Sequence, residues 1–347
     1  MALTDLALDA APNLNLDRFP RTTLCHRPTP IEAMPRLGEA LGGLSLFIKR
    51  DDCTGLATGG NKTRKLEFLL GEALREGADM LVTHGAVQSN HVRQTAAAAC
   101  RMGLKCHALL ERRVQDAGPG YETSGNVLLD KVFGTTIEYR PAGLDMNAEA
   151  AAAAERLRAE GHRPYFIPGG GSNATGALGY VDCAQEIVAH CAGEDRDFDW
   201  IVTATGSTGT HAGLVAGLHA LGSAMPVMGI SVRQPQDKQI AAVHGLAVKT
   251  AEKLGTEAPP AAKVLVDDGY VGPGYGIPAE STLEAIAMTA RTEGILLDPV
   301  YSAKGMAGLI GLARQGVLKP TDRVLFLHTG GATALFAYED LVLSGVA

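Results

Sequence analysis

Four segments of the sequence combine glycine with side chains that can bind an anion or carry a proton. They are GLATGGNK at 55–62, GGGSNATGALG at 169–179, GSTGTHAG at 206–213 and HTGG at 328–331. Glycine lets backbone N–H groups turn toward a ligand, and a helix that begins there adds free N–H groups and the positive end of its dipole. We therefore expect these segments to surround one ligand.

The 206–213 segment is the best candidate for a phosphate site. Backbone amides and hydroxyls come from Gly206, Ser207, Thr208, Gly209 and Thr210. The segment lacks the GK[ST] ending of a P-loop and the GxGxxG spacing of a dinucleotide site, which argues against a nicotinamide dehydrogenase. An ordinary helix start that contains glycine is the alternative interpretation.

Lys62 is the candidate nucleophile. It follows Gly-Gly-Asn at the start of an amphipathic helical pattern, with Arg64 and Lys65 close in sequence. Desolvation or neighbouring cations lower the pKa of a lysine and make its amine nucleophilic. Taken alone, a lysine at this place is more commonly a solvated side chain.

Further polar side chains follow other expected strands. Gln88, Ser89, Asn90 and His91 come after the apolar run at 80–83, and they could hold a carboxylate, although a Ser or Asn N-cap would explain part of the run. Tyr275 and Tyr301 lie in the turn-like segments GPGYGIP and DPVYSAKG, where a tyrosine can donate a proton, stack on a flat ring or simply pack. Neither metal-ligand spacing nor a nucleophile elbow is present.

Short apolar runs alternate with helical patterns along the chain. We expect strands at 46–49, 80–83, 106–110, 165–167, 200–204, 227–232 and 324–327, and helices at 145–160, 177–190, 211–221, 280–293 and 303–314. This alternation predicts an α/β fold with parallel sheets and helices on both faces, in which ligands bind at the carboxyl ends of the strands.

Composition narrows the classes of function. The 347 residues include 42 Gly, and 38 acidic residues outnumber 31 basic ones, for a net charge of −7. An acidic chain is a poor match for nucleic acid, and no apolar run is long enough to span a membrane. Residues 1–17 are not typical of a secretory signal, and six scattered cysteines without CxxC pairs indicate free thiols. We therefore expect a cytoplasmic protein.

Several motifs, in order, resemble the pyridoxal-phosphate enzymes of fold type II. They are KRDD at 49–52, GGNKTRKLEF at 59–68, QSNHVRQTAA at 88–97, PGGGSN at 168–173, GALGYV at 176–181, ATGSTGTHAG at 204–213, GYGIP at 274–278, GILLDPVYSAKG at 294–305 and FLHTGGA at 326–332. The nearest branch contains D-cysteine desulfhydrase, 1-aminocyclopropane-1-carboxylate deaminase and L-cysteate sulfo-lyase. The resemblance implies a tryptophan-synthase-β-like, three-layer αβα fold and a homodimer. It also implies a large domain at 1–62 and 175–347, with a small domain at 63–174 inserted in it.

The resemblance also implies site roles. Lys62 would hold pyridoxal 5′-phosphate as a Schiff base and remove the Cα proton of the substrate, and Asn90 would contact the ring hydroxyl. The 206–210 segment would bind the phosphate, and Thr329, with Ser302, would face the pyridine nitrogen. Ser89 with Gln88 and His91 would hold the substrate carboxylate, and Tyr275 and Tyr301 would flank the substrate. Loss of a β-substituent from a small amino acid would then yield pyruvate and ammonium.

Some stretches resemble L-cysteate sulfo-lyase in particular: DDCTGLATGG at 51–60, RPAGLDMNAE at 140–149, GISVRQP at 229–235 and YVGPGYGIP at 270–278. The resemblance favours L-cysteate as substrate, then D-cysteine. The cyclopropane deaminase is third, because it carries Glu at the position of Ser302, and a non-catalytic cofactor-binding protein is a further alternative. A sulfonate needs donors, so we assign it to Arg233 with Thr54 or Thr58, against the alternative of a surface or subunit-contact arginine.

Overall fold

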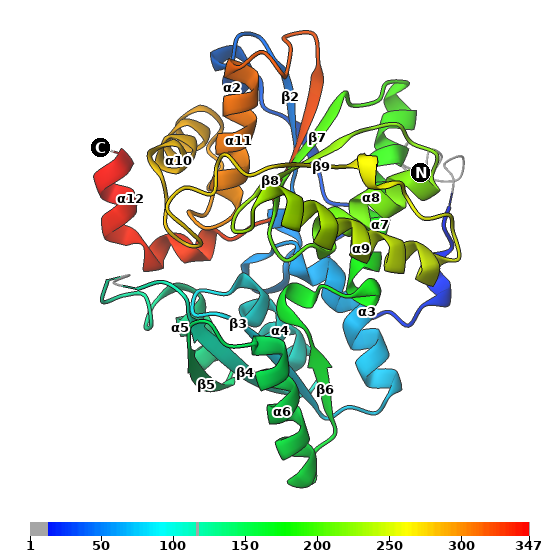
Figure 1. Cartoon of the computed structure of the whole chain (residues 1–347), viewed down its shortest axis with the longest axis vertical. Coiled ribbons are helices and arrows are strands. Elements are labelled where there is room, and N and C mark those ends of the chain that lie inside the picture. Colours follow the sequence, from blue (N-terminus) through cyan, green and yellow to red (C-terminus); the bar gives the residue numbers. More distant parts are fainter. Residues whose placement is uncertain (1–12, 116–117, 347) are drawn as a thin grey trace.

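Two β-sheets organise the chain in a computed structural model that describes residues 13–115 and 118–346 (Figure 1). Part of the expectation of a non-secretory N-terminus falls on residues 1–12, outside the described residues. The larger sheet has the order β1-β2-β10-β7-β8-β9. Its strands are β1 (Ile31–Ala33), β2 (Ser45–Lys49), β7 (Trp200–Thr205), β8 (Val227–Ser231), β9 (Val264–Asp267) and β10 (Arg323–Leu327).

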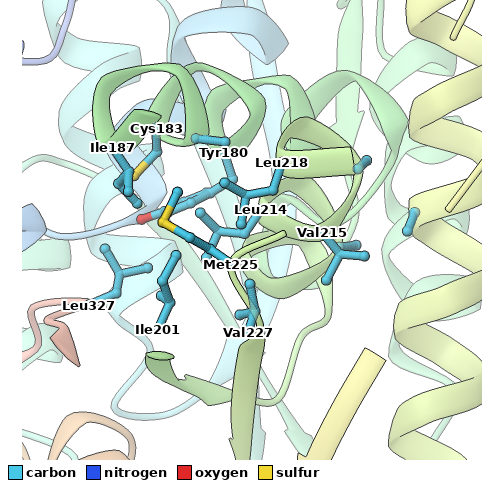
Figure 2. Packing of buried hydrophobic residues seen from close by; sticks show 14 of the residues in the cluster. Tyr180, Cys183, Ile187, Ile201, Leu214, Val215, Leu218, Met225, Val227 and Leu327 are labelled. Atoms are coloured by element: carbon cyan, nitrogen blue, oxygen red, sulfur yellow. The ribbon is translucent and has the colours of Figure 1, made fainter. Parts of the chain in front are cut away.

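Helices cover both faces of this sheet. Along β10, Leu325 and Leu327 pack with one apolar cluster, while Val324 and Phe326 pack with another, as the two-residue period of a strand requires. On the first face lie α7 (Ala174–Glu194), α8 (Gly209–Ala220) and α9 (Gln236–Leu254), and Figure 2 shows part of that core. On the second lie α2 (Pro35–Ala40), α10 (Glu280–Glu293) and α11 (Ser302–Arg314), while α12 (Glu339–Val346) packs on α10.

The smaller sheet has the order β5-β4-β3-β6, and all its pairings are parallel. Its strands are β3 (Met80–Ala86), β4 (Lys105–Arg112), β5 (Thr136–Pro141) and β6 (Pro164–Ile167). One face packs on α6 (Met146–Ala159), and the other on α3 (Lys62–Arg75) and α4 (Asn90–Arg101), while α5 (Gly125–Val132) lies beside α4. This sheet lies wholly within residues 63–174, and the division into two domains at those bounds stays a prediction.

The predicted α/β fold with largely parallel sheets and helices on both faces is confirmed. Each expected strand and helix is present with ends shifted by a few residues, and α10 has the expected bounds. The edge strand β1 differs, because it runs antiparallel to β2. All six cysteines are free thiols, as expected. Within residues 13–115 and 118–346, no helix is long and apolar enough to cross a membrane.

Two helices, α3 and α7, carry the chain between the two sheets and pack tightly on each other (Figure 1). A Cβ at Gly179 of α7 would lie 2.4 Å from the backbone carbonyl of Arg64, so only glycine permits this approach. The guanidinium of Arg64 is fully buried and bonds the carboxylates of Asp51 and Glu186 at 2.7–2.9 Å. Buried charges of this kind must be paired, so the contact fixes α3, and with it Lys62, against the larger sheet.

Candidate active site

A cavity of about 350 Å³ lies where the carboxyl ends of β3, β7 and β8 approach the first turns of α3, α4 and α8. That volume is within the ~300–1,000 Å³ of ordinary small-molecule sites. Most of the residues predicted from the sequence line it: Lys62, Ser89, Asn90, His91, Gly206, Ser207, Thr208, Thr210, Arg233, Tyr275, Tyr301 and Thr329. Segments far apart in the sequence therefore meet at one site.

Lys62 begins α3, and its amine faces this cavity. The Nζ donates a hydrogen bond of 2.8 Å to Oδ1 of Asn61. Burial lowers the pKa of Lys62 to about 8, with Arg93 acting in the same direction and Asp298 opposing. A lysine with this pKa carries a useful fraction of neutral amine near neutral pH, which a nucleophile or proton acceptor requires.

The first turn of α8 is the candidate anion site in the cavity that Lys62 lines. A Cβ at Gly209 would lie 3.0 Å from Nζ of Lys65 and 2.9 Å from Oγ of Ser172, so glycine keeps that space open. Thr208, just before the helix, has a φ of 63°, and its side chain does not cap the helix. The N-terminal end of α8, the Ser172 hydroxyl and the Nζ of Lys65 thus lie close together, and a phosphate beside them would be well compensated.

Lys65 was predicted from the sequence only to be a cation near Lys62. In the structure it is fully buried, and its Nζ donates to the carbonyl oxygen of Gly170 at 3.1 Å. Burial, aided by Lys62, lowers its pKa well below the usual range. The available signal was its spacing, because residues i and i+3 of a helix lie on the same face. An anion at the start of α8 would restore the charge of this ammonium.

Asn61 connects these two ends of the site. Its Nδ2 donates to Oγ1 of Thr210 at 2.9 Å, and its backbone N–H donates to the carbonyl oxygen of Thr329 at 3.0 Å. The lysine amine, the α8 start and the Thr329 segment are therefore held by one residue. The sequence motif contained Asn61, but no pattern indicated this role.

The 88–91 run divides into different roles. Ser89 accepts a bond from the N–H of Val92 at 3.2 Å, so it is the N-cap of α4, and its own hydroxyl proton has no acceptor among the described residues. Oδ1 of Asn90 accepts bonds from Arg93 and from Asn126 at 3.0 and 3.1 Å. Ser89 thus caps the helix and keeps a donor available beside the cavity.

Carboxylate binding by His91 is not supported. The hydroxyl of Thr83 donates to the carbonyl oxygen of Ile167 at 2.9 Å, so Nε2 of His91 must donate to Thr83 Oγ1 at 2.8 Å. Burial lowers the pKa of His91 well below its usual range, which keeps the ring neutral. Its Nδ1 is therefore an acceptor without a partner among the described residues, and it would repel a carboxylate.

Three further residues predicted to bind substrate make other contacts and are absent from the cavity lining. Thr54 is buried away from the cavity, and its Oγ1 exchanges bonds with the backbone of Gly60 at 2.8 and 3.0 Å, which shapes the loop before Lys62. Thr58 is exposed and pairs with the hydroxyl of Thr333 at 2.8 Å. Gln88 bonds the backbone of Tyr121, Ser124 and Asn126, so all its polar atoms are taken up in holding α5.

Ser302 is also placed differently from the prediction. It is fully buried, its Oγ donates to Oδ1 of Asp298 at 2.6 Å, and it accepts from the N–H of Asp298 at 2.8 Å. The described cavity lining includes Thr329 and not Ser302 or Gly209. Thr329 is thus left as the candidate hydroxyl for the cofactor nitrogen, and Ser302 orients the loop that carries Tyr301.

Tyr275 and Tyr301 meet at the cavity wall. Their hydroxyls hydrogen-bond each other, and their rings pack edge to face with centroids 5.8 Å apart. Burial raises the pKa of Tyr275, which Arg113 opposes, and burial with the Tyr275 contact raises that of Tyr301 well above the usual range. Both phenols therefore keep their protons at neutral pH, and the pair can hold or donate a proton beside the substrate.

Sequence reasoning missed several other lining residues, among them His84, Arg113, Asn147 and Ser172. Arg113 directly follows β4, so its place at the carboxyl edge of a parallel sheet was a usable signal. Asn147 lies in the first turn of α6, two residues after the expected helix start at Asp145, and no motif in the sequence marked it.

Comparisons with known proteins agree with this geometry. The family model described as "Pyridoxal-phosphate dependent enzyme" matches residues 22–330. A crystal structure of an ACC deaminase homologue is 38% identical, with a TM-score of 0.86 over 99% of this chain and 100% of the other. Two structures of O-ureido-L-serine synthase are 17% and 18% identical, with TM-scores of 0.66 and 0.62 over 93% and 91% of this chain, and 93% and 96% of theirs, and they share the fold.

The residues present fit pyridoxal phosphate. The group needs an amine, a phosphate site and a partner for its ring nitrogen. Lys62 offers the amine, the α8 start with Lys65 offers the phosphate site, and Thr329 lies in the same lining. Lys65 is buried, and its Nζ donates to the neutral carbonyl oxygen of Gly170 rather than to a carboxylate, which most directly calls for an anion there.

Proposed function

Because the chain belongs to the family of pyridoxal-phosphate dependent enzymes, we propose that it is a lyase that removes the β-substituent of a small amino acid. The favoured substrate is L-cysteate, which with water yields pyruvate, sulfite and ammonium. Membership of this family identifies the cofactor as pyridoxal phosphate. The assignment of the reaction and the substrate rests on the side chains that line the cavity beside Lys62.

When bound, the cofactor supplies an electron sink for the carbanion formed at the substrate Cα. Lys62 would attach the cofactor and, once displaced by the substrate amine, accept the Cα proton on Nζ. Its pKa of about 8 supports this role, since an ordinary lysine would be almost wholly protonated near neutral pH. Asn61 would keep Nζ oriented through its 2.8 Å hydrogen bond.

Other residues of the cavity would position the substrate and move a second proton. The hydroxyl of Ser89 can donate a hydrogen bond to the substrate carboxylate. The Tyr275–Tyr301 pair can hold a proton near the departing group. Thr329 would offer its neutral hydroxyl to the ring nitrogen of the cofactor, which would keep the electron sink moderate and suit loss of a good leaving group.

The observation that carries the substrate assignment is Arg233. It follows β8 at the carboxyl edge of the larger sheet, lines the cavity, and its guanidinium has no ion pair or hydrogen bond to a residue the structure describes. A guanidinium matches an oxyanion through several fixed donors. A substrate with a sulfonate would use this charge, whereas a thiol would not.

A substrate panel tests the proposal. The holoenzyme is given L-cysteate, D-cysteine, L-cysteine and 1-aminocyclopropane-1-carboxylate, and pyruvate or 2-oxobutanoate, sulfite and sulfide are measured. We expect sulfite and pyruvate in equal amounts from L-cysteate. Faster release of sulfide from D-cysteine than of sulfite from L-cysteate would reject the assignment. Ring opening of the cyclopropane substrate, which is included because an ACC deaminase homologue has a similar structure, would also reject it.

We also propose a homodimer. Large apolar side chains are exposed on α5, on the turn at Ala332–Ala337 and on α12: Leu128, Val132, Phe336 and Leu343. A second copy would remove them from water. Light scattering should give twice the chain mass, and Phe336→Glu should lower it; a wild-type monomer would contradict the proposal.

A further inference from the structure

We propose that Arg113 and Arg233 act together as a two-sided clamp that selects substrates with a negatively charged β-substituent. This inference rests on the proposed lyase function and adds Arg113, which was not among the residues predicted from the sequence. The clamp joins the two sheets, since Arg113 follows β4 of the smaller sheet and Arg233 follows β8 of the larger one. Both side chains line the cavity that contains Lys62.

Arg113 is held in place by a carboxylate. Its Nε donates to Oε2 of Glu111, and Oε1 of that buried glutamate accepts the N–H of Gly143 at 3.1 Å. The terminal nitrogens Nη1 and Nη2 have no hydrogen bond to any described residue. The side chain is 19% exposed, so these donors are largely withdrawn from bulk water. Fixed donors of this kind bind an anion with little further loss of freedom.

Tyr275 lies beside Arg113 and in the same cavity lining as Arg233. The guanidinium carbon of Arg113 lies 5.3 Å from the centre of the Tyr275 ring. Positive charge from Arg113 and from Arg233 lowers the pKa of the Tyr275 phenol, against the rise caused by burial. Both charges are thus felt at one hydroxyl on the cavity wall.

The charges around the clamp do not balance without a ligand. Glu111 pairs with Arg113, while Arg233 has no carboxylate partner in residues 13–115 and 118–346. A sulfonate has three acceptor oxygens, so it can take bonds from two guanidiniums at once. A neutral substituent such as a thiol would leave those donors unpaired, and the site would discriminate against it.

The arginines could instead bind the α-carboxylate of the substrate. Two substrates distinguish binding of the α-carboxylate from binding of the β-substituent. L-cysteate and β-chloro-L-alanine share the carboxylate and the handedness, but only the first has a charged β-substituent. We expect Arg113→Gln and Arg233→Gln each to lower kcat/KM on L-cysteate by about 10- to 100-fold, the usual weight of a charge-assisted hydrogen bond, and to change it on β-chloro-L-alanine by less than about threefold. Equal losses on both substrates, or no loss, would overturn the clamp.

Arg112→Gln is the matched control. Arg112 is the preceding residue, but it is 48% exposed and pairs with Glu122 at 2.7 Å. Its replacement should therefore leave kcat/KM unchanged on both substrates. Arg113→Gln leaves Glu111 without its cation; if that variant does not fold, Arg233→Gln, at an exposed residue, carries the test. The visible absorption of the bound cofactor confirms that each variant is loaded.

Binding without turnover separates this inference from the proposed function. Calorimetry with 3-sulfopropanoate, which lacks the reactive amine, should give a Kd about 10- to 100-fold weaker in either arginine variant than in the wild-type holoenzyme. If this holds while L-cysteate is not cleaved, the clamp stands and the lyase assignment fails. If the wild type cleaves L-cysteate, and the arginine variants bind 3-sulfopropanoate and cleave L-cysteate as well as the wild type does, the clamp is rejected while the lyase assignment stands.

Discussion

Nζ of Lys62 donates a 2.8 Å hydrogen bond to Oδ1 of Asn61, the residue before it in the chain. The same amide donates from Nδ2 to Thr210 in the first turn of α8 at 2.9 Å. One side chain therefore spaces the amine from the anion site before any ligand binds. Such fixed spacing reduces the reorganisation needed on binding, so we regard the pocket as preorganised for a ligand with both a reactive carbonyl and a phosphate.

Replacement of Lys62 by alanine should abolish covalent attachment of the cofactor. We expect the wild type to show a visible absorption band and, after borohydride treatment, a cofactor fixed to the peptide that contains Lys62. Lys62→Ala should show neither and should release no pyruvate. Lys105→Ala, at an exposed position in β4, is the control and should match the wild type. Retention of the fixed cofactor by Lys62→Ala would show that another lysine attaches it.

The rate of cofactor attachment to the apoprotein should depend on pH. Burial lowers the pKa of Lys62 to about 8, and only the neutral amine reacts. The neutral fraction, and so the rate, should rise about tenfold per unit below pH 8 and level off above it. Stopped-flow absorbance from pH 6 to 10 measures this. A rate that still rises steeply beyond pH 9 would mean that the lysine has its ordinary pKa.

The sequence predicts the fold well because its strands are buried and alternate with strongly periodic helices. The strands that it missed, β1, β5 and β9, are short or lie at sheet edges, where burial is partial and the apolar pattern is weak. The helices α2, α5, α9 and α12 are missed as well. In α5 the buried residues are Gly125, Asn126, Val127 and Asp130, so its apolar pattern is weak. Edge elements take their structure from neighbours rather than from their own residues.

The site was predictable only in part, because motifs identify segments and not the direction of each side chain. Lys62, Ser89 and Tyr301 come from motifs whose side chains do face the cavity. Ser302 lies next to Tyr301, yet it is turned to Asp298, because both hydrogen-bonding positions of its hydroxyl are satisfied there. His91 lines the cavity with its accepting nitrogen, and that outcome depends on Thr83, eight residues away.

Removal of the buried ammonium at Lys65 should weaken cofactor binding. Lys65→Met keeps the length of the side chain but loses the charge near the α8 start, where Nζ now contacts Gly170. We expect the Kd of pyridoxal phosphate to rise about 10- to 100-fold, as for a lost charge-assisted bond, and that of unphosphorylated pyridoxal to change little. An equal effect on both ligands, measured by fluorescence titration, would place Lys65 away from the phosphate.

Acid should loosen the contact between α3 and α7. Burial alone would raise the pKa of Glu186, but Arg64 and Lys49 outweigh it and lower the pKa from 4.5 to about 2. Stability from this carboxylate is therefore present above pH 4.5 and is lost as the pH falls toward 2. The shift corresponds to about 3 kcal/mol at neutral pH. Urea unfolding of Glu186→Gln should show that loss at pH 7 and a smaller difference from the wild type at pH 3.

The hydroxyl pair of Tyr275 and Tyr301 should matter for turnover more than for cofactor binding. Each phenol gives the other a partner in a buried setting, so Tyr275→Phe or Tyr301→Phe leaves one hydroxyl unpaired and removes one proton carrier. We expect kcat to fall about 100-fold or more, within the range for a lost acid–base group, while the visible cofactor band persists. Tyr270→Phe is the control, since its hydroxyl has only a 3.5 Å contact with Gln315. If the double variant loses no more than either single one, the two tyrosines act as one unit, whereas multiplicative losses would assign them separate steps.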